Sequence, residues 1–238
     1  MVAIQQVKAK YPDFKFMAEV YFQEDVDMLQ LGFDFVYDKE GLYDGLVQKS
    51  AAYVNQYIAT KTPYLAKGSH FVENHDEDRA ALHFGSNAKA NAAALASFTL
   101  PGMRFSFEGQ WLGRRNKLEI HLLRSYQEAV DRDYQTEVFY SKLLPLLNDD
   151  IWHNGEWQLL DAASDSLLAW RWDLGTQVAL VVVNYSGADV TSTVSLKAPS
   201  KVITMTEKFS GLQVEYDGSK INAEGLKVTV SQWVSQIM

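Results

Sequence analysis

Short apolar runs alternate with longer segments of helical pattern over about the first 150 residues of the chain. Four of these runs are rich in aromatic or β-branched residues and are too short to be helices. They are expected to form strands at 14–22, 33–38, 69–75 and 103–107. Strands at this spacing, with helical patterns between them, predict four parallel βαβ units.

Three stretches between and after these runs have the pattern of helices. Residues 50–60 are expected to form a helix that ends before Pro63. Residues 86–100 are rich in alanine and begin at Ser86, which is a favourable N-cap residue. A last helix is expected within 135–144. The first part of the chain therefore reads as α/β.

The pattern changes after residue 152. From Glu156 onward, strand-like runs are separated by turn sequences such as "DLG", "SGAD" and "YDGSK", which is typical of an antiparallel β-sandwich. The expected fold class is α/β plus all-β, with an α/β part at 1–152 and a β-sandwich at 153–238. Most tryptophans of the second part are expected in its core, among them Trp170 and Trp172.

Composition restricts the classes of partner. The 238 residues are 47% apolar and 22% charged, as in an ordinary globular protein, and the net charge is -8. This acidic balance argues against nucleic acid and against anionic membrane, since both require a basic face. There is no cysteine, and no apolar run reaches the roughly 18 residues that a membrane span needs. The start has no signal-peptide pattern, which favours the cytoplasm and leaves the native compartment open.

Residues able to carry chemistry follow several of the expected strands. Functional groups of parallel sheets lie at the carboxyl ends of the strands. Glu19 lies near the end of the first strand, His75 and Asp76 at the end of the third, and Trp111 after the fourth. Two carboxylates that converge from different strands suit cleavage of a glycosidic bond. The alternative is that Glu19 is an ordinary surface residue of its strand.

The acidic stretch around Asp76 has other interpretations. Glu77 and Asp78 read as charges in the first turn of a helix, where they would complement its dipole. A metal site built from His70, His75 and Asp76 is a further alternative. It lacks a histidine pair at helical spacing and any recognisable spacing of ligands. We therefore expect no metal.

Four stretches together carry a family resemblance. They are "FMAEVYF", "FDFVYDKEGLYDGL", "HFVENHDEDRAA" and "LPGMRFSFEGQWLGRR". In this order and spacing they resemble the fifth to eighth β/α units of the (β/α)8 TIM barrel of the α-amylase family, glycoside hydrolase family 13. The β-rich remainder resembles the C-terminal sandwich of that family, domain C. The resemblance covers essentially the whole chain and implies a partial TIM barrel followed by an antiparallel β-sandwich.

The resemblance also implies roles for individual residues. Glu19 matches the general acid/base of the family, and Asp76 matches the carboxylate that stabilises the transition state. His75 matches the neighbouring substrate-binding histidine. Arg79 is expected to partner a carboxylate and, with Trp111, to belong to the substrate-binding set. The implied activity is retaining hydrolysis or transfer on an α-glucan or oligosaccharide, without a cofactor.

The chain departs from the family pattern at the nucleophile. The family carries this aspartate in a "G-x-R-x-D" setting after the fourth barrel strand, and the chain has no such stretch. Asp25, Asp34 and Asp38 are alternatives that nothing in their spacing recommends. We therefore expect a truncated chain that is inactive alone and needs an N-terminal half barrel, or a second copy of itself, to close the barrel.

A function of another class remains open at this stage. A half barrel with domain C could be a non-catalytic carbohydrate-binding or assembly module. Coding sequence upstream that contains "G-x-R-x-D" would identify a fragment or a split gene. A dimer in solution would instead favour self-completion. A generic acidic α/β protein with no link to sugars is the third alternative.

Overall fold

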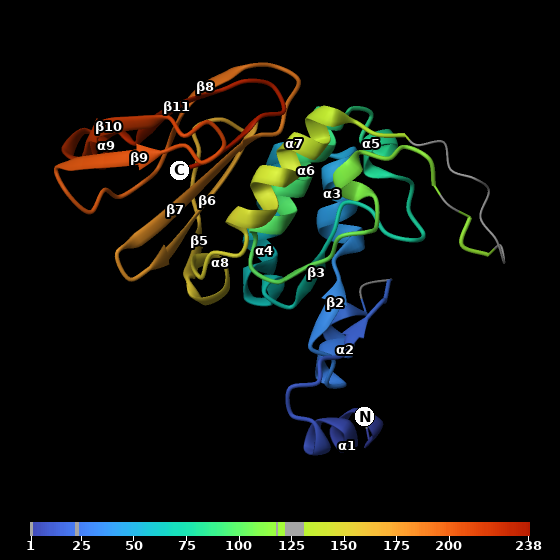
Figure 1. Ribbon diagram of the computed structural model, residues 1–238. Helices are drawn as coiled ribbons and strands as arrows, with labels where there is room; N and C mark the ends of the chain where they lie inside the picture. The colour runs from blue at the N-terminus through green and yellow to red at the C-terminus, as the bar shows by residue number, and fades with distance from the viewer. Residues whose placement is uncertain (1, 22–23, 118, 122–130) are drawn as a thin grey trace.

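The computed structural model describes residues 2–21, 24–117, 119–121 and 131–238 (Figure 1). Within these residues, no helix has both the length and the apolar character to cross a membrane. The described part of the chain holds a parallel sheet with its helices, followed by antiparallel strands.

The parallel sheet has four strands in the order β1-β2-β3-β4. They are β1 (Met17–Ala18), β2 (Phe35–Tyr37), β3 (Gly68–His70) and β4 (Met103–Arg104). Each neighbouring pair is parallel, as the alternation of strands and helices predicts. The strands are shorter than the apolar runs that contain them, because each ladder joins only two residue pairs. Residue 22, the end of the first expected run, lies outside the described residues.

Helical segments precede, connect and follow these strands. They are α1 (Val2–Lys10), α2 (Asp25–Gln30), the π-helical η1 (Lys39–Tyr43), α3 (Asp44–Gln48), α4 (Ala51–Leu65), α5 (Ala80–His83), α6 (Asn87–Thr99), the 3₁₀ segment η2 (Gln110–Leu112), α7 (Tyr134–Leu146) and α8 (Ile151–Asn154). Ser86 caps α6 as expected, since its Oγ accepts a hydrogen bond from the backbone N–H of Lys89 at 3.2 Å.

The expected end of the helix near residue 60 is wrong, because α4 passes Pro63 and ends at Leu65. Ile58 and Leu65 of this helix are both buried in the core. Packing of an apolar face can outweigh the local helix propensity that Pro63 lowers.

The antiparallel strands begin at residue 156 and form three sheets. The larger sheet has the order β12-β7-β6-β5, and two pairs, β11-β8 and β10-β9, accompany it. The strands are β5 (Glu156–Leu159), β6 (Leu167–Leu174), β7 (Gln177–Asn184), β8 (Val190–Val194), β9 (Val202–Thr206), β10 (Gln213–Asp217), β11 (Leu226–Val230) and β12 (Ser235–Ile237). The helix α9 (Gly218–Glu224) precedes β11.

The sheet that contains β6 and β7 is buried on both faces. Leu168 and Trp170 on one face belong to a core shared with the helices of the first part. Leu167 and Ala169 on the other face belong to a second core, among the remaining β-strands. Figure 1 shows α6 and α7 beside these strands. A continuous apolar core therefore crosses the division expected at residue 152.

Thr99, at the end of α6, is a polar link across this shared core. Its Oγ accepts a hydrogen bond from the indole N–H of Trp170 at 3.2 Å, and its carbonyl oxygen accepts one from Trp172 at 2.8 Å. Thr99 and Trp170 are fully buried, so the side-chain contact excludes water. Buried polar groups of this kind need a partner, because an unpaired donor keeps its cost of desolvation.

Thr99→Val is expected to lower the free energy of unfolding by about 1–3 kcal/mol, because it leaves the Trp170 indole N–H without an acceptor. Urea unfolding measures the effect. Thr191→Val, on the exposed side of β8, is the control and should change stability by less than about 0.5 kcal/mol. Equal effects of the two substitutions would contradict this role of Thr99.

Candidate active site

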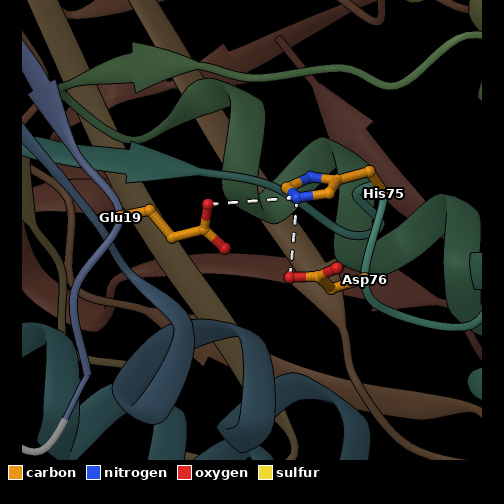
Figure 2. A group of neighbouring side chains, drawn as sticks. All are labelled: Glu19, His75 and Asp76. Carbon is orange, nitrogen blue, oxygen red and sulfur yellow. Dashed lines mark ion pairs between the residues drawn. The ribbon is translucent and has the colours of Figure 1, made fainter. Parts of the chain in front are cut away.

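Glu19, His75 and Asp76 lie together at one end of the parallel sheet (Figure 2). Glu19 directly follows β1, and the other two residues lie in the loop after β3. The Nε2 atom of His75 is 4.0 Å from Oε2 of Glu19 and 3.5 Å from Oδ2 of Asp76. Side chains from two non-adjacent strands thus meet around one imidazole. All three are partly exposed, so a ligand can reach them.

Two tyrosines accompany these carboxylates, and the sequence assigned neither of them to the site. The hydroxyl of Tyr21 donates a hydrogen bond to Oε1 of Glu19 at 2.6 Å. Burial and the bond to Glu19 raise the pKa of Tyr21, so its phenol stays protonated and remains a donor. Burial, together with the charges of Glu19 and Asp76, also raises the pKa of Tyr37 at the end of β2. Period-two alternation from Glu19 could have indicated Tyr21.

Asn74 shapes the turn that carries Asp76. Its Oδ1 accepts hydrogen bonds from the backbone N–H groups of Asp76 at 2.9 Å and Glu77 at 2.8 Å. Asn74 is buried, in contrast to the exposed Asp76 that follows it. A side-chain acceptor of this kind imposes a tight turn on the backbone. The carboxylate of Asp76 is therefore presented by a loop with a defined conformation.

Arg79 lies beneath this loop, in contact with Glu73. Its Nη1 donates to Oε1 of Glu73 at 2.6 Å, and the two side chains are 1% and 2% exposed. The same Nη1 donates to the carbonyl oxygen of Glu108 at 2.7 Å, while Oε2 of Glu73 accepts from the backbone N–H of Ala80 at 2.7 Å. The structure thus confirms the expected carboxylate partner of Arg79 and corrects its expected place in the substrate-binding set. The side chain is enclosed, and its partner is Glu73, to which the sequence assigned no role.

Glu77 ties the loop to the segment after β2. Its Oε1 is 3.2 Å from Nζ of Lys39, which also lies 3.2 Å from Oδ1 of Asp44. Its Oε2 accepts a hydrogen bond from the hydroxyl of Tyr43 at 3.3 Å. Burial acts to lower the pKa of Lys39, but the hydrogen bonds to Glu77 and Asp44 raise it. The side chain of Glu77 therefore holds the loop against the segment after β2. It does not lie in the first turn of a helix, as was expected, because α5 begins only at Ala80.

The remaining candidates lie apart from the trio Glu19, His75 and Asp76. Trp111 is on η2 and is 38% exposed, but among the described residues no hydrogen bond, ion pair or ring contact joins it to the trio. His70 is fully buried, and its Nε2 lies 2.9 Å from the carbonyl oxygen of Pro101. The alternative metal site that included His70 is therefore not assembled.

The three aspartates considered as alternative nucleophiles have other partners. Asp25 pairs with Lys61 at 2.9 Å, and Asp34 pairs with Lys8 at 2.9 Å. Asp38 is buried, and its Oδ1 accepts hydrogen bonds from the hydroxyl of Tyr57 and from a backbone N–H. Among the described contacts, none brings one of these carboxylates to Glu19 or Asp76.

Glu19, His75 and Asp76 also form a group that could hold a metal ion. One ligand atom from each lies within 4.8 Å of the others. Two carboxylates and an imidazole form a donor set that divalent metals accept. The same closeness of carboxylates suits acid–base chemistry at a sugar linkage, since it places a proton donor and a second negative charge around one centre.

Comparison with known proteins identifies several that resemble the chain. No protein-family model matches it. The α-amylase MalA of Haloarcula japonica is 32% identical over 128 residues, which cover 51% of this chain and 18% of that protein. The chain therefore spans less than a fifth of this curated relative.

Solved structures resemble nearly the whole chain. The maltogenic α-amylase AmyB of Thermotoga neapolitana superposes with a TM-score of 0.77 at 19% identity, over 98% of this chain and 57% of that one. The α-amylase of Geobacillus thermoleovorans gives a TM-score of 0.74 at 17% identity, over 98% and 55%. The debranching enzyme of Nostoc punctiforme gives 0.74 at 17% identity, over 98% and 53%. At such identities these likenesses show the fold, over about half the length of each enzyme.

Proposed function

The chain is related to the α-amylase family, and on this premise we propose that it supplies two catalytic carboxylates of a retaining glycoside hydrolase or transglycosylase that acts on α-glucans. Glu19 is the general acid/base, Asp76 stabilises the transition state, and His75 binds the sugar. The observation that carries the proposal is the meeting of Glu19 and Asp76 around His75, at 4.0 and 3.5 Å. Proton donation and charge stabilisation at one centre are what cleavage of a glycosidic bond needs.

In this proposal the nucleophile comes from a different stretch of polypeptide. Residues 1–152 are units five to eight of a TIM barrel, and 153–238 are domain C. The 238 residues contain no "G-x-R-x-D" stretch, and Asp25, Asp34 and Asp38 have other partners. An N-terminal half barrel, or a second copy of the chain, completes the barrel. The chain alone then has negligible activity, because no nucleophile faces Glu19.

Complementation tests this function. We expect the purified chain alone to leave maltoheptaose intact, and expect turnover when a separately expressed half barrel that contains "G-x-R-x-D" is added. Turnover should be lost with Glu19→Gln, while Asp78→Asn, an exposed carboxylate in the Asp76 loop, serves as the matched control and keeps it. Sugar release measured by chromatography reports the result.

Three outcomes of this experiment would change the proposal. Turnover by the chain alone, abolished by Glu19→Gln, would refute the need for a second part. Turnover that survives Glu19→Gln would refute the role of Glu19. Saturable binding of maltoheptaose with no turnover in any combination would favour the alternative, a carbohydrate-binding or assembly module.

A further inference from the structure

A cavity of about 400 Å³ lies between α2 and α4, and none of Glu19, His75 and Asp76 lines it. Its walls come from the two helices, from β2 and from η1, and it reaches Gly68 at the start of β3. Figure 1 shows α2 beside β2. The volume falls within the range of about 300–1,000 Å³ that small-molecule sites occupy. The proposed function does not use this cavity.

Three tyrosines of α4 line the cavity in one stripe. The stripe consists of Tyr53, of Tyr57 four residues later, and of Tyr64 seven residues after that. At about 100° per residue, they lie within about 40° of one another around the helix axis. At about 1.5 Å per residue, the stripe is about 16 Å long. Aligned aromatic rings of this kind offer flat apolar faces with polar tips.

Backbone contacts hold two of these rings in place. A Cβ atom added at Gly41 would lie 2.0 Å from the ring of Tyr57, and one at Gly45 would lie 3.2 Å from the ring of Tyr53. The hydroxyl of Tyr57 donates to Oδ1 of Asp38 at 2.5 Å. Rings that are fixed before binding lose little conformational freedom when a ligand arrives.

The hydroxyl groups of the other two tyrosines, Tyr53 and Tyr64, are accessible to a ligand. Tyr53 is 41% exposed and Tyr64 is 47% exposed. Within the described part of the chain, neither hydroxyl makes a hydrogen bond, so both can donate to and accept from a ligand. Between them along the helix, Lys61 lies in the same cavity and is paired with Asp25 at 2.9 Å.

The charges of the cavity favour a neutral ligand. Lys61 and Asp25 offset one another, and Asp38 lies beside Nδ1 of His70 at 3.2 Å. Lys39 and Glu40, which also line the cavity, carry opposite charges. A fully apolar ligand would remove water from these charged groups without replacing its hydrogen bonds, which is costly. An anion would meet the carboxylate of Asp25. A neutral molecule with many hydroxyl groups and an apolar face satisfies both the polar groups and the rings.

We propose that the cavity between α2 and α4 is a second carbohydrate site, which binds a neutral oligosaccharide along the stripe of Tyr53, Tyr57 and Tyr64. The chemistry of the ligand follows from the lining, and only the choice of an α-glucan rests on the proposed function. Glu19, His75 and Asp76 do not line such a site, although Val20, which follows Glu19, and Tyr37 do.

Calorimetric titration of the 238-residue chain with maltoheptaose tests the site. All proteins carry Glu19→Gln and Asp76→Asn, which weaken binding at the candidate active site. Tyr53→Ala with Tyr64→Ala is expected to weaken the remaining affinity about ten-fold or more, because two ring faces are lost. Tyr134→Ala is the matched control, since that tyrosine is 79% exposed on α7 and distant in sequence.

A measurement on the unaltered chain guards against variants that fail to fold. Maltoheptaose is expected to slow amide hydrogen exchange within residues 51–65. No slowing there, no binding at all, or equal affinity of the tyrosine double variant and the control would each overturn the site. Binding that requires Glu19 and Asp76 but not the tyrosines would also overturn it, and would leave the proposed function standing. Binding that requires the tyrosines supports the site even where complementation gives no turnover.

Discussion

Arg79→Met is expected to lower the free energy of unfolding by about 3–5 kcal/mol, because it leaves the carboxylate of Glu73 buried without its cation. The two side chains are 1% and 2% exposed, so water cannot replace the lost partner. The carbonyl oxygen of Glu108, which accepts from the same Nη1, loses a donor as well. Urea unfolding at neutral pH measures the loss.

The loss should also depend on pH. Burial raises the pKa of Glu73 above its usual value, against the lowering effects of the Ala80 N–H and Arg79. A carboxyl group whose pKa is raised on folding favours the folded state at low pH and loses this contribution as pH rises. Removing Arg79 raises the pKa of Glu73 further. The variant should therefore lose less stability at about pH 4.5 than at about pH 7.5.

A double variant separates the charge from the packing. Glu73→Gln keeps an acceptor for the N–H of Ala80 and removes the charge. Added to Arg79→Met, it is expected to recover part of the lost stability, because no charge is left unpaired. A loss below about 1 kcal/mol with no pH dependence would show that solvent reaches the pair.

The sequence predicted the closeness of Glu19 and Asp76 better than it predicted the strand lengths. Glu19 and Asp76 follow strands β1 and β3, which are separated in the chain by β2 and the helical segments on either side of it. The rule for parallel sheets places both residues at one edge. The structure brings them around His75. The apolar runs are longer than the strands that form within them. Apolar character indicates an extended segment, but the length of a strand depends on where two backbones lie side by side and form hydrogen bonds.

The support beneath the site could be predicted only in part, for a physical reason. The resemblance gave Arg79 a carboxylate partner but did not identify Glu73 as that partner. Glu73 and Arg79 are six residues apart in a loop, a spacing that no helix or strand period brings together. Their contact depends on the path of the loop and on enclosure by the segment around Glu108. The charges of Glu19 and Asp76 likewise act on Tyr37, which lies on another strand. Such contacts arise from tertiary packing, which local patterns do not encode.

In the completed barrel, Glu19→Gln is expected to lower kcat on maltoheptaose by about 10²–10⁴-fold, because the leaving sugar oxygen loses its proton donor. A substrate whose leaving group needs no proton should escape most of this loss. With α-maltosyl fluoride, the step that releases fluoride should therefore fall by no more than about ten-fold, since a general acid contributes little there.

Asp76→Asn separates the second role from the first. If Asp76 stabilises the positive charge that develops on the sugar ring, its loss affects every substrate, whatever the leaving group. We therefore expect Asp76→Asn to lower the rates on maltoheptaose and on α-maltosyl fluoride by similar factors. Single-turnover measurements of sugar release from maltoheptaose and of fluoride release from α-maltosyl fluoride give the two rates. Rates on the fluoride that fall equally for the two variants would contradict the assignment of Glu19 as the acid, because the two carboxylates would then act in the same way.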